Sequence, residues 1–214
     1  MSYKKRVFDC LKKGKILCFF RELLVYSWKG DDLFSYLLFF LIVFLAYNYV
    51  FTPFVFPLLF KTKIPFNTIV SESMEHNLDF ENWWERYGFF YEKYFNITKN
   101  DFENFPFKEG LDIGDFVFIV GIKNDDIKVG DIVVYYVPNL NKYIVHRVVK
   151  IKENGCFETL GDNNIKLFFY GLNPQLPFEK NVCEIEGKVV FKIPYLGLPR
   201  YWLFVLSNEI KSIL

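Results

Sequence analysis

Two serines, a histidine and an aspartate are the side chains of this sequence that suit acyl-transfer chemistry. Ser71 and Ser73 lie in the stretch IVSESM, His146 lies in IVHRV, and Asp162 lies in GDNN. A serine hydroxyl becomes an effective nucleophile when a base removes its proton, and neutral imidazole has a suitable pKa for that task. A carboxylate would fix the imidazole tautomer. These residue types therefore predict a Ser–His–Asp triad or a Ser–His dyad.

Each of these residues also has an ordinary structural interpretation. Serines populate turns because their hydroxyls hydrogen-bond the local backbone. A single histidine in an apolar strand is more often structural than catalytic, and an Asp after Gly is typical of a turn. The order of the residues along the chain does not show that the groups meet, so the chemistry depends on the elements that carry them.

An apolar segment precedes the serines and is long enough to cross a bilayer. Residues 33–60 contain no charged side chain, and about 20 apolar residues suffice to span the hydrocarbon core. Residues 33–50 are expected to form the helix proper, and Pro53 and Pro57 to end or kink it. A removable secretory signal would have a shorter apolar core, and a buried core helix would have a polar face. We therefore interpret residues 33–60 as a transmembrane anchor.

Basic residues flank this anchor unequally. Eight lysines and arginines lie in residues 1–32, whereas only Lys61 and Lys63 follow the anchor closely. The positive-inside rule then predicts a cytoplasmic basic tail over residues 1–32 and a single-pass protein of the cell membrane whose later residues lie outside. Residues 7–25 suit an amphipathic helix on the inner leaflet, or a short helix docked on protein, which Gly14 favours.

Residues 61–190 are predicted to form an outer, mainly β catalytic domain. Stretches rich in β-branched and aromatic residues are bounded by turn pairs such as Gly-Asp and Asn-Gly. These predicted strands are residues 116–122, 132–137, 143–151 and 156–160.

Residues 78–110 do not fit the strand pattern. Their many aromatic residues, set among acids, recur at a spacing nearer to helix than to strand. We expect an inserted helical subdomain that acts as a lid or brace, or whose aromatic rings rest on the lipid surface.

The C-terminal segment, residues 191–214, is apolar but interrupted by Pro194, Pro199 and Arg200. We expect it to dip into the outer membrane interface, with Tyr195 and Trp202 among the side chains at headgroup level. A second membrane crossing is the alternative.

The net charge and the spacing of the cysteines argue against two classes of function, nucleic-acid binding and zinc binding. Lys+Arg 26 against Asp+Glu 25 leaves a net charge of +1, which gives no electrostatic reason to expect nucleic-acid binding. No Cys-x-x-Cys pair occurs, so neither a zinc site nor another cofactor is expected. Cys156 and Cys183 would meet an oxidising compartment, but two free buried thiols are the favoured prediction over a disulfide.

The order of the motifs resembles the type I signal peptidase family, in its archaeal branch and in the catalytic subunit of the endoplasmic reticulum complex. An anchor is followed by S-x-S-M, a G-D strand, a strand with H-R-V, G-D-N-N and G-K-V-V, over residues 33 to 197. The resemblance implies a coiled β-sheet fold and cleavage after small residues in an A-x-A-like pattern. It implies Ser73 as nucleophile and His146, in place of the bacterial Lys, as general base. The Ser73 N–H and the Ser71 hydroxyl would form the oxyanion hole, and Met74 would line the cleft.

Three features depart from the family pattern. His76 stands where the family has Pro, and the aromatic insertion lengthens a spacer that is usually short. The second Asp of related His-type enzymes, six residues after Asp162, is replaced by Phe168; a gapped alignment brings Asn173 near that place, still without charge. The third member therefore stays open: Asp162 is the best remaining carboxylate, and a Ser–His dyad is the alternative.

These patterns together predict a membrane-bound serine endopeptidase that removes N-terminal signal peptides from exported preproteins. Its partners would be signal peptides, the lipid bilayer and the protein translocation machinery. The alternative is a catalytically inactive membrane-anchored module that binds exported chains by strand addition. A self-cleaving repressor-like serine peptidase is a second alternative, but such proteins are soluble and use Lys as the base.

Overall fold

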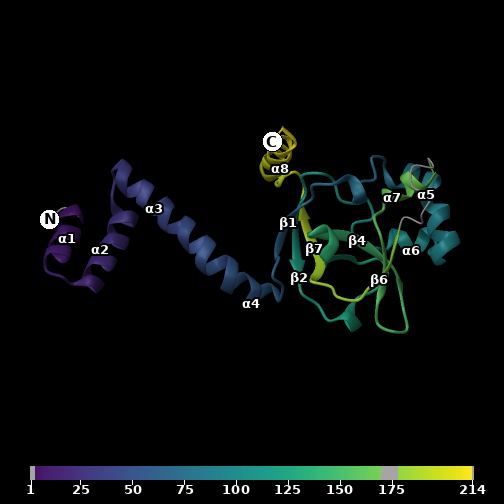
Figure 1. The fold of residues 1–214 in the computed structure, drawn as a ribbon, viewed down its shortest axis with the longest axis horizontal. Helices are drawn as coiled ribbons and strands as arrows, with labels where there is room; N and C mark the ends of the chain where they lie inside the picture. The colour runs from purple at the N-terminus through teal and green to yellow at the C-terminus, as the bar shows by residue number, and fades with distance from the viewer. Residues whose placement is uncertain (1–2, 170–177, 214) are drawn as a thin grey trace. The chain divides into compact units, whose positions relative to one another are not determined.

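A computed structural model describes residues 3–169 and 178–213 of the chain. The chain divides into two compact units, Met1–Phe56 and Pro57–Leu214 (Figure 1). In its described residues the first unit consists of helices joined by short turns, and the second unit contains a β-sheet with helices around it.

The first unit begins with two helices, α1 (Tyr3–Lys12) and α2 (Ile16–Lys29), rather than one helix over residues 7–25. Gly14 lies between them with a φ of 64°, a left-handed conformation that glycine adopts without a Cβ penalty. A disulfide between Cys10 and Cys18 joins α1 to α2. Helix α3 (Leu33–Ala46) follows, and the Asp32 side chain caps it by accepting a hydrogen bond from the Ser35 N–H at 3.0 Å.

Residues Leu33–Phe60 form a helical run that is long and apolar enough to cross a membrane. Pro53 and Pro57 were expected to end or kink the helix, and neither ends this run. The segment Tyr47–Val55 around Pro53 is a π-helix, and α4 (Phe56–Phe60) continues the run. Wider π-type turns accommodate a residue that lacks an N–H to donate. Within residues 3–169 and 178–213, no second helix meets the same length and composition criteria.

The second unit is organised by one seven-stranded sheet in which every neighbouring pair is antiparallel. The strands are β1 (Phe66–Thr68), β2 (Phe116–Val120), β3 (Ile132–Val137), β4 (Lys142–Ile151), β5 (Phe157–Leu160), β6 (Phe178–Val182) and β7 (Gly187–Ile193). Their spatial order is β1-β2-β7-β3-β4-β5-β6. The four predicted strands correspond to β2, β3, β4 and β5.

Four helices accompany the sheet. They are α5 (Phe80–Phe95), α6 (Lys99–Glu103), α7 (Asn164–Phe169) and α8 (Leu198–Ile213). Helix α8 lies at the β1 edge, whereas α5, α6 and α7 lie together at the other side of this unit (Figure 1). The prediction of a mainly β chain is not confirmed, because the two N-terminal helices, the membrane-length run, the insertion and α8 outweigh seven short strands.

Helix α5 carries most of the aromatic residues of the insertion, and it turns them toward the protein core. Asp79 caps its first turn, and Asn96, with a φ of 56°, ends it. Six of its rings are buried in a cluster that includes Val149 of β4 and Leu160 of β5; they are Phe80, Trp83, Trp84, Tyr87, Phe90 and Tyr91. These rings are not available to a lipid surface, so the helix acts as a brace for the central strands.

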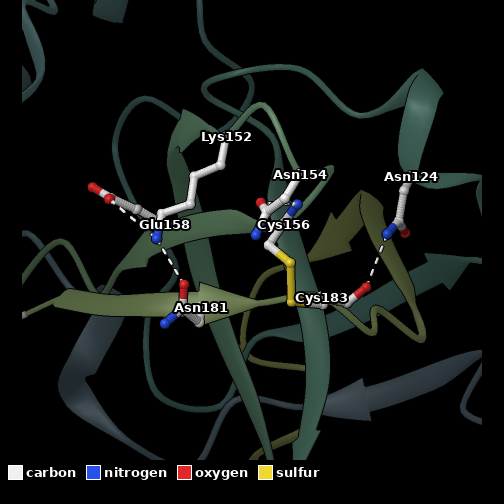
Figure 2. Close-up of a disulfide and its surroundings, with 7 residues drawn as sticks. All are labelled: Asn124, Lys152, Asn154, Cys156, Glu158, Asn181 and Cys183. Carbon is white, nitrogen blue, oxygen red and sulfur yellow. Dashed lines mark hydrogen bonds and ion pairs between the residues drawn. A yellow bond between two sulfur atoms is a disulfide. The ribbon is translucent and has the colours of Figure 1, made fainter.

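A disulfide between Cys156 and Cys183 corrects the prediction of two free thiols (Figure 2). Strands β5 and β6 pair with Phe157 opposite Val182, so the residue before β5 and the residue after β6 lie opposite each other, with 4.2 Å between their Cα atoms. The sequence could not supply this register, because the residues between the two cysteines carry no clear pairing signal. The bond fastens the edge strand β6 to the sheet.

The C-terminal segment forms helix α8 despite its prolines. Pro199 is the second residue of the helix, where a missing N–H costs nothing. Trp202, Leu203 and Leu206 are exposed on the helix, and Tyr195 is exposed just before it. Tyr201 is only half-buried.

Candidate active site

Ser73 lies in a short 3₁₀ helix, Glu72–Met74, which follows strand β1. The loop after strand β5 holds this helix in place: the Asn163 N–H donates to the Ser73 carbonyl at 2.9 Å, and the Asn163 side chain donates to the Glu72 carbonyl at 2.8 Å. On the other side, the Leu111 N–H donates to the Met74 carbonyl at 2.9 Å. The GDNN motif therefore positions the predicted nucleophile, although the two are far apart in sequence.

His146 lies in the centre of strand β4, opposite Val133 of β3, and is 4% exposed. Its Nδ1 atom lies 3.0 Å from Oε2 of Glu179 and 3.3 Å from the Tyr135 hydroxyl. Its Nε2 atom points toward the Ser73 loop, as the surroundings of Gly161 show. A Cβ atom at Gly161 would lie 2.7 Å from His146 Nε2 and 2.8 Å from the Ser73 carbonyl oxygen.

The Ser73 backbone and the His146 imidazole therefore lie near each other. The Ser73 carbonyl oxygen and His146 Nε2 both lie within 3 Å of the position that a Cβ atom at Gly161 would take. Among the described residues, the Ser73 hydroxyl makes its hydrogen bond with the Ser71 hydroxyl, at 3.3 Å, and not with His146. Catalytic hydrogen bonds are often long without substrate and tighten in the complex, so a missing Ser73–His146 hydrogen bond does not exclude this pair as nucleophile and base.

Replacing Gly161 with alanine should impair the site, because the new Cβ must displace either the imidazole or the Ser73 backbone. A misplacement of about 1 Å in such a pair costs on the order of 10²-fold in turnover. Steady-state kinetics on the folded variant would measure the loss. Gly155→Ala is the matched control, since its Cβ would meet nothing within 4 Å and only its φ of 75° is strained. Equal turnover in the two variants would show that the approach at Gly161 is unimportant.

A cleft runs beside Ser73, between the segment after β1 and the start of β4. Its lining includes Ile69, Ser71, Ser73, Met74, Tyr143 and Val145. Met74 is almost fully buried and also packs in the core cluster of Val117 and Ile132, so it forms the inner wall of the cleft. The cleft is thus lined by two stretches of backbone, one of which carries Ser73.

Asp162 makes no hydrogen bond to His146 in the described structure. It accepts hydrogen bonds from Arg147 Nη2 at 2.8 Å and Nε at 3.1 Å, and from the Tyr91 hydroxyl at 2.8 Å. It also lies 3.0 Å from His76 Nε2. Burial raises the pKa of the Asp162 carboxyl, but the Arg147 charge and the hydrogen bonds from His76 and Arg147 outweigh this and hold it well below its usual range. This carboxylate is therefore engaged by partners other than the imidazole that it was expected to orient.

Arg147 is the centre of this buried cluster. It is fully buried, donates to the carbonyls of Pro106, Phe107 and Gly130 at 2.9 Å, and lies over the Phe102 ring. A buried charge that is paired and fully hydrogen-bonded is stable only while each partner is present. The cluster therefore fixes the loop at Asp162 against the strand that carries His146.

His76 connects the same cluster to the aromatic insertion. Its ring stacks on Trp83 of α5 with 3.8 Å between the centroids, while its Nε2 atom faces Asp162. The Tyr91 hydroxyl, from the same helix, reaches Asp162 as well. The departure from Pro at residue 76 and the inserted helix are thus parts of one packing arrangement.

Glu179 is the site residue that sequence reasoning missed. It lies on β6 opposite Thr159 of β5, and its Oε2 atom accepts a hydrogen bond from the Thr159 hydroxyl at 3.2 Å. The residue has no motif around it, and its approach to His146 depends on a strand pairing that the sequence does not reveal. Phe168 belongs to α7 but its side chain is outside the described structure, and Asn173 lies outside the described residues.

Comparison with known proteins gives a partial match. No family model matches the chain. Over 89 residues the chain is 46% identical to "Signal peptidase complex catalytic subunit SEC11C" of Homo sapiens, Mus musculus and Canis lupus familiaris. The aligned region covers 40% of this chain and 46% of each relative, so the chain spans about half the length of the curated relatives it matches.

Proposed function

We propose that this chain is a membrane-bound serine endopeptidase of the type I signal peptidase kind, which removes N-terminal signal peptides from exported preproteins. The observation that carries the proposal is that the Ser73 backbone and His146 Nε2 both lie close to Gly161, and that a cleft lies beside Ser73. The 46% identity to the catalytic subunit named SEC11C supports the same reaction class.

In this mechanism His146 Nε2 takes the proton of the Ser73 hydroxyl as Oγ attacks the scissile carbonyl carbon. The oxygen of the tetrahedral intermediate is stabilised by the Ser73 N–H and the Ser71 hydroxyl. The imidazolium then protonates the leaving amine, which departs with the mature chain. A water molecule, deprotonated by the same imidazole, hydrolyses the acyl-enzyme and restores Ser73.

The substrate would bind in an extended conformation between the backbone after β1 and the first residues of β4. Met74 closes the inner end of this cleft, so small side chains before the scissile bond fit there best. Strand addition, the basis of the binding-only alternative, becomes here the step that precedes cleavage.

The function is tested with the full chain, purified in detergent or lipid, and a preprotein whose signal peptide ends in an A-x-A-like site. Cleavage should occur at that site, and it should stop when the small residue before the scissile bond is changed to a large aromatic residue. Mass spectrometry of the products locates the cut. Cleavage that ignores this substitution, or no cleavage of any preprotein, would contradict the proposal.

We also propose the membrane arrangement that this function needs. Residues 1–32 are a cytoplasmic tail, residues 33–60 cross the cell membrane, residues 61–190 form the outer catalytic domain, and residues 191–214 lie at the outer interface. The excess of basic residues before Leu33 supports the orientation. The exposed apolar side chains of α8 support the last assignment. The bilayer, signal peptides and the translocation machinery are the partners that this arrangement implies.

Protease added outside sealed cells should therefore digest residues beyond Lys63 and spare the N-terminal tail. Mass spectrometry of the protected fragment measures this. The cysteines supply a second readout, because cytoplasmic reductants open disulfides. Although the structure bonds both pairs, Cys10 and Cys18 should be alkylated in cells without prior reduction, and Cys156 and Cys183 should not. Digestion of the N-terminal tail together with a Cys10–Cys18 bond that persists in cells would show that the topology is the reverse of the proposed one.

A further inference from the structure

Glu179 is the carboxylate that contacts His146 in the described part of the chain. Its Oε2 atom lies 3.0 Å from His146 Nδ1, whereas Asp162 is engaged by Arg147 and Tyr91. The position six residues after Asp162, where related enzymes carry a second Asp, holds Phe168. We propose that Glu179, from strand β6, is the positioning residue that orients His146. This inference rests on the proposed function.

The hydrogen bonds around Glu179 are consistent with a chain of donors that ends at its carboxylate. The Tyr135 hydroxyl lies 3.1 Å from the Thr159 hydroxyl, and Thr159 donates to Glu179. Burial and the Glu179 charge raise the pKa of Tyr135, so Tyr135 keeps its proton and can donate it to Thr159. The carboxylate then accepts from both Thr159 and the His146 Nδ1–H. With Nδ1 protonated, Nε2 carries the lone pair that a general base requires.

The charge of Glu179 fits this role. Partial burial raises the pKa of its carboxyl, but the hydrogen bond and charge of His146 outweigh burial and lower it. The group is therefore ionised at neutral pH and stabilises the imidazolium that forms when Ser73 loses its proton. Since its side chain is 42% exposed, solvent weakens the effect relative to a buried carboxylate.

The fold secures the strand that carries this residue. Among the strands of the described residues, β6 pairs with β5 alone, so it needs fastening at the sheet edge. The Cys156–Cys183 disulfide supplies this at the far end of the strand, and Lys152 donates to Asn181 at 2.7 Å beside it (Figure 2). The longer Glu side chain then spans the distance from β6 across β5 to β4.

Glu179→Gln tests the inference. A Gln amide can donate as well as accept, so it also permits the wrong imidazole tautomer, with hydrogen on Nε2. We expect kcat to fall roughly 10²–10³-fold, less than the about 10⁴ lost when a buried triad aspartate is changed to Asn, with KM little changed. Glu179→Asp, which keeps the charge but shortens the reach, should lose less than Glu179→Gln. Glu158→Gln, on the adjacent strand, is the matched control and should keep full activity.

Ring ¹⁵N spectra of histidine-labelled protein give a readout that does not depend on cleavage. The chain has two histidines, and His76→Gln identifies the signals of His146. The native protein should show His146 protonated at Nδ1, and Glu179→Gln should show a mixture of tautomers. An unchanged spectrum together with full kcat in Glu179→Gln would overturn the role of Glu179 and leave the peptidase intact. Absence of cleavage by the native chain would instead overturn the proposed function, while the spectra would still decide the role of Glu179.

Discussion

Ser73→Ala should abolish preprotein cleavage while leaving the fold unchanged, because it removes the hydroxyl that is proposed to form the acyl-enzyme. Ser71→Ala should lower turnover by about 10²–10³, the usual effect of removing one oxyanion donor. The experiment is a time course of preprotein cleavage by both variants and the native chain, with near-ultraviolet circular dichroism as the check on folding.

The two hydroxyls lie only 3.3 Å apart, so each must be tested as the nucleophile. Mass spectrometry of enzyme trapped with a serine-acylating inhibitor would locate the modified residue. Two results would show that Ser71, and not Ser73, is the nucleophile. One is inhibitor label on Ser71, and the other is an inactive Ser71→Ala variant together with an active Ser73→Ala variant. Loss of labelling in Ser73→Ala alone would agree with the mechanism.

Asp162→Asn should destabilise the sheet-containing unit by about 3–5 kcal/mol, since it leaves the buried Arg147 charge without its counter-charge. Unfolding of the full chain in detergent by guanidinium, followed by tryptophan fluorescence, measures the change. Asp79→Asn is the matched control: Asp79 is exposed, and Asn caps a helix about as well as Asp does, so a change within about 0.5 kcal/mol is expected.

The difference in the free energy of unfolding between the native chain and Asp162→Asn should depend on pH in a definite direction. The pKa of Asp162 is depressed in the folded protein, so its contribution to stability is complete above its unfolded pKa of about 3.9 and declines as the pH falls from there toward the folded value. The gap between native and variant should thus be constant at neutral pH and close only in strong acid. A stable Asp162→Asn protein with greatly reduced kcat would instead return Asp162 to a direct part in catalysis.

The predictable parts of this protein were those that depend on local patterns. Alternating β-branched and aromatic residues located β2 to β5. The motifs named Ser73 and His146 as candidate residues, but their order along the chain did not show that the two would lie close together. The contact of Glu179 and the Cys156–Cys183 bond could not be predicted in the same way. Both depend on the register of β5 with β6, which is set by pairing across residues distant in sequence.

The departures from the family pattern have a shared physical explanation. His76 would be an awkward replacement for Pro in isolation, because a buried imidazole needs partners. Here Trp83 of the aromatic helix covers one face of the ring, and Asp162, which also accepts a hydrogen bond from Tyr91 of that helix, meets its Nε2 atom. In the sequence, His76 and the aromatic insertion are two separate departures from the family pattern, because only three-dimensional contacts connect them.

His146 and Arg147 are consecutive on β4, so strand alternation directs them to opposite faces of the sheet. This adjacency makes the strand intolerant of single-residue insertions and deletions. Deleting Val145 would shift the following residues by one place, which moves the imidazole to the opposite face of the strand, in the place of Val145, and sets a permanent cation where His146 was. A deletion in the Pro138–Leu140 turn could be absorbed before the strand begins. Insertions and deletions among natural homologues of this domain should therefore occur at that turn and not within strand β4, which follows it.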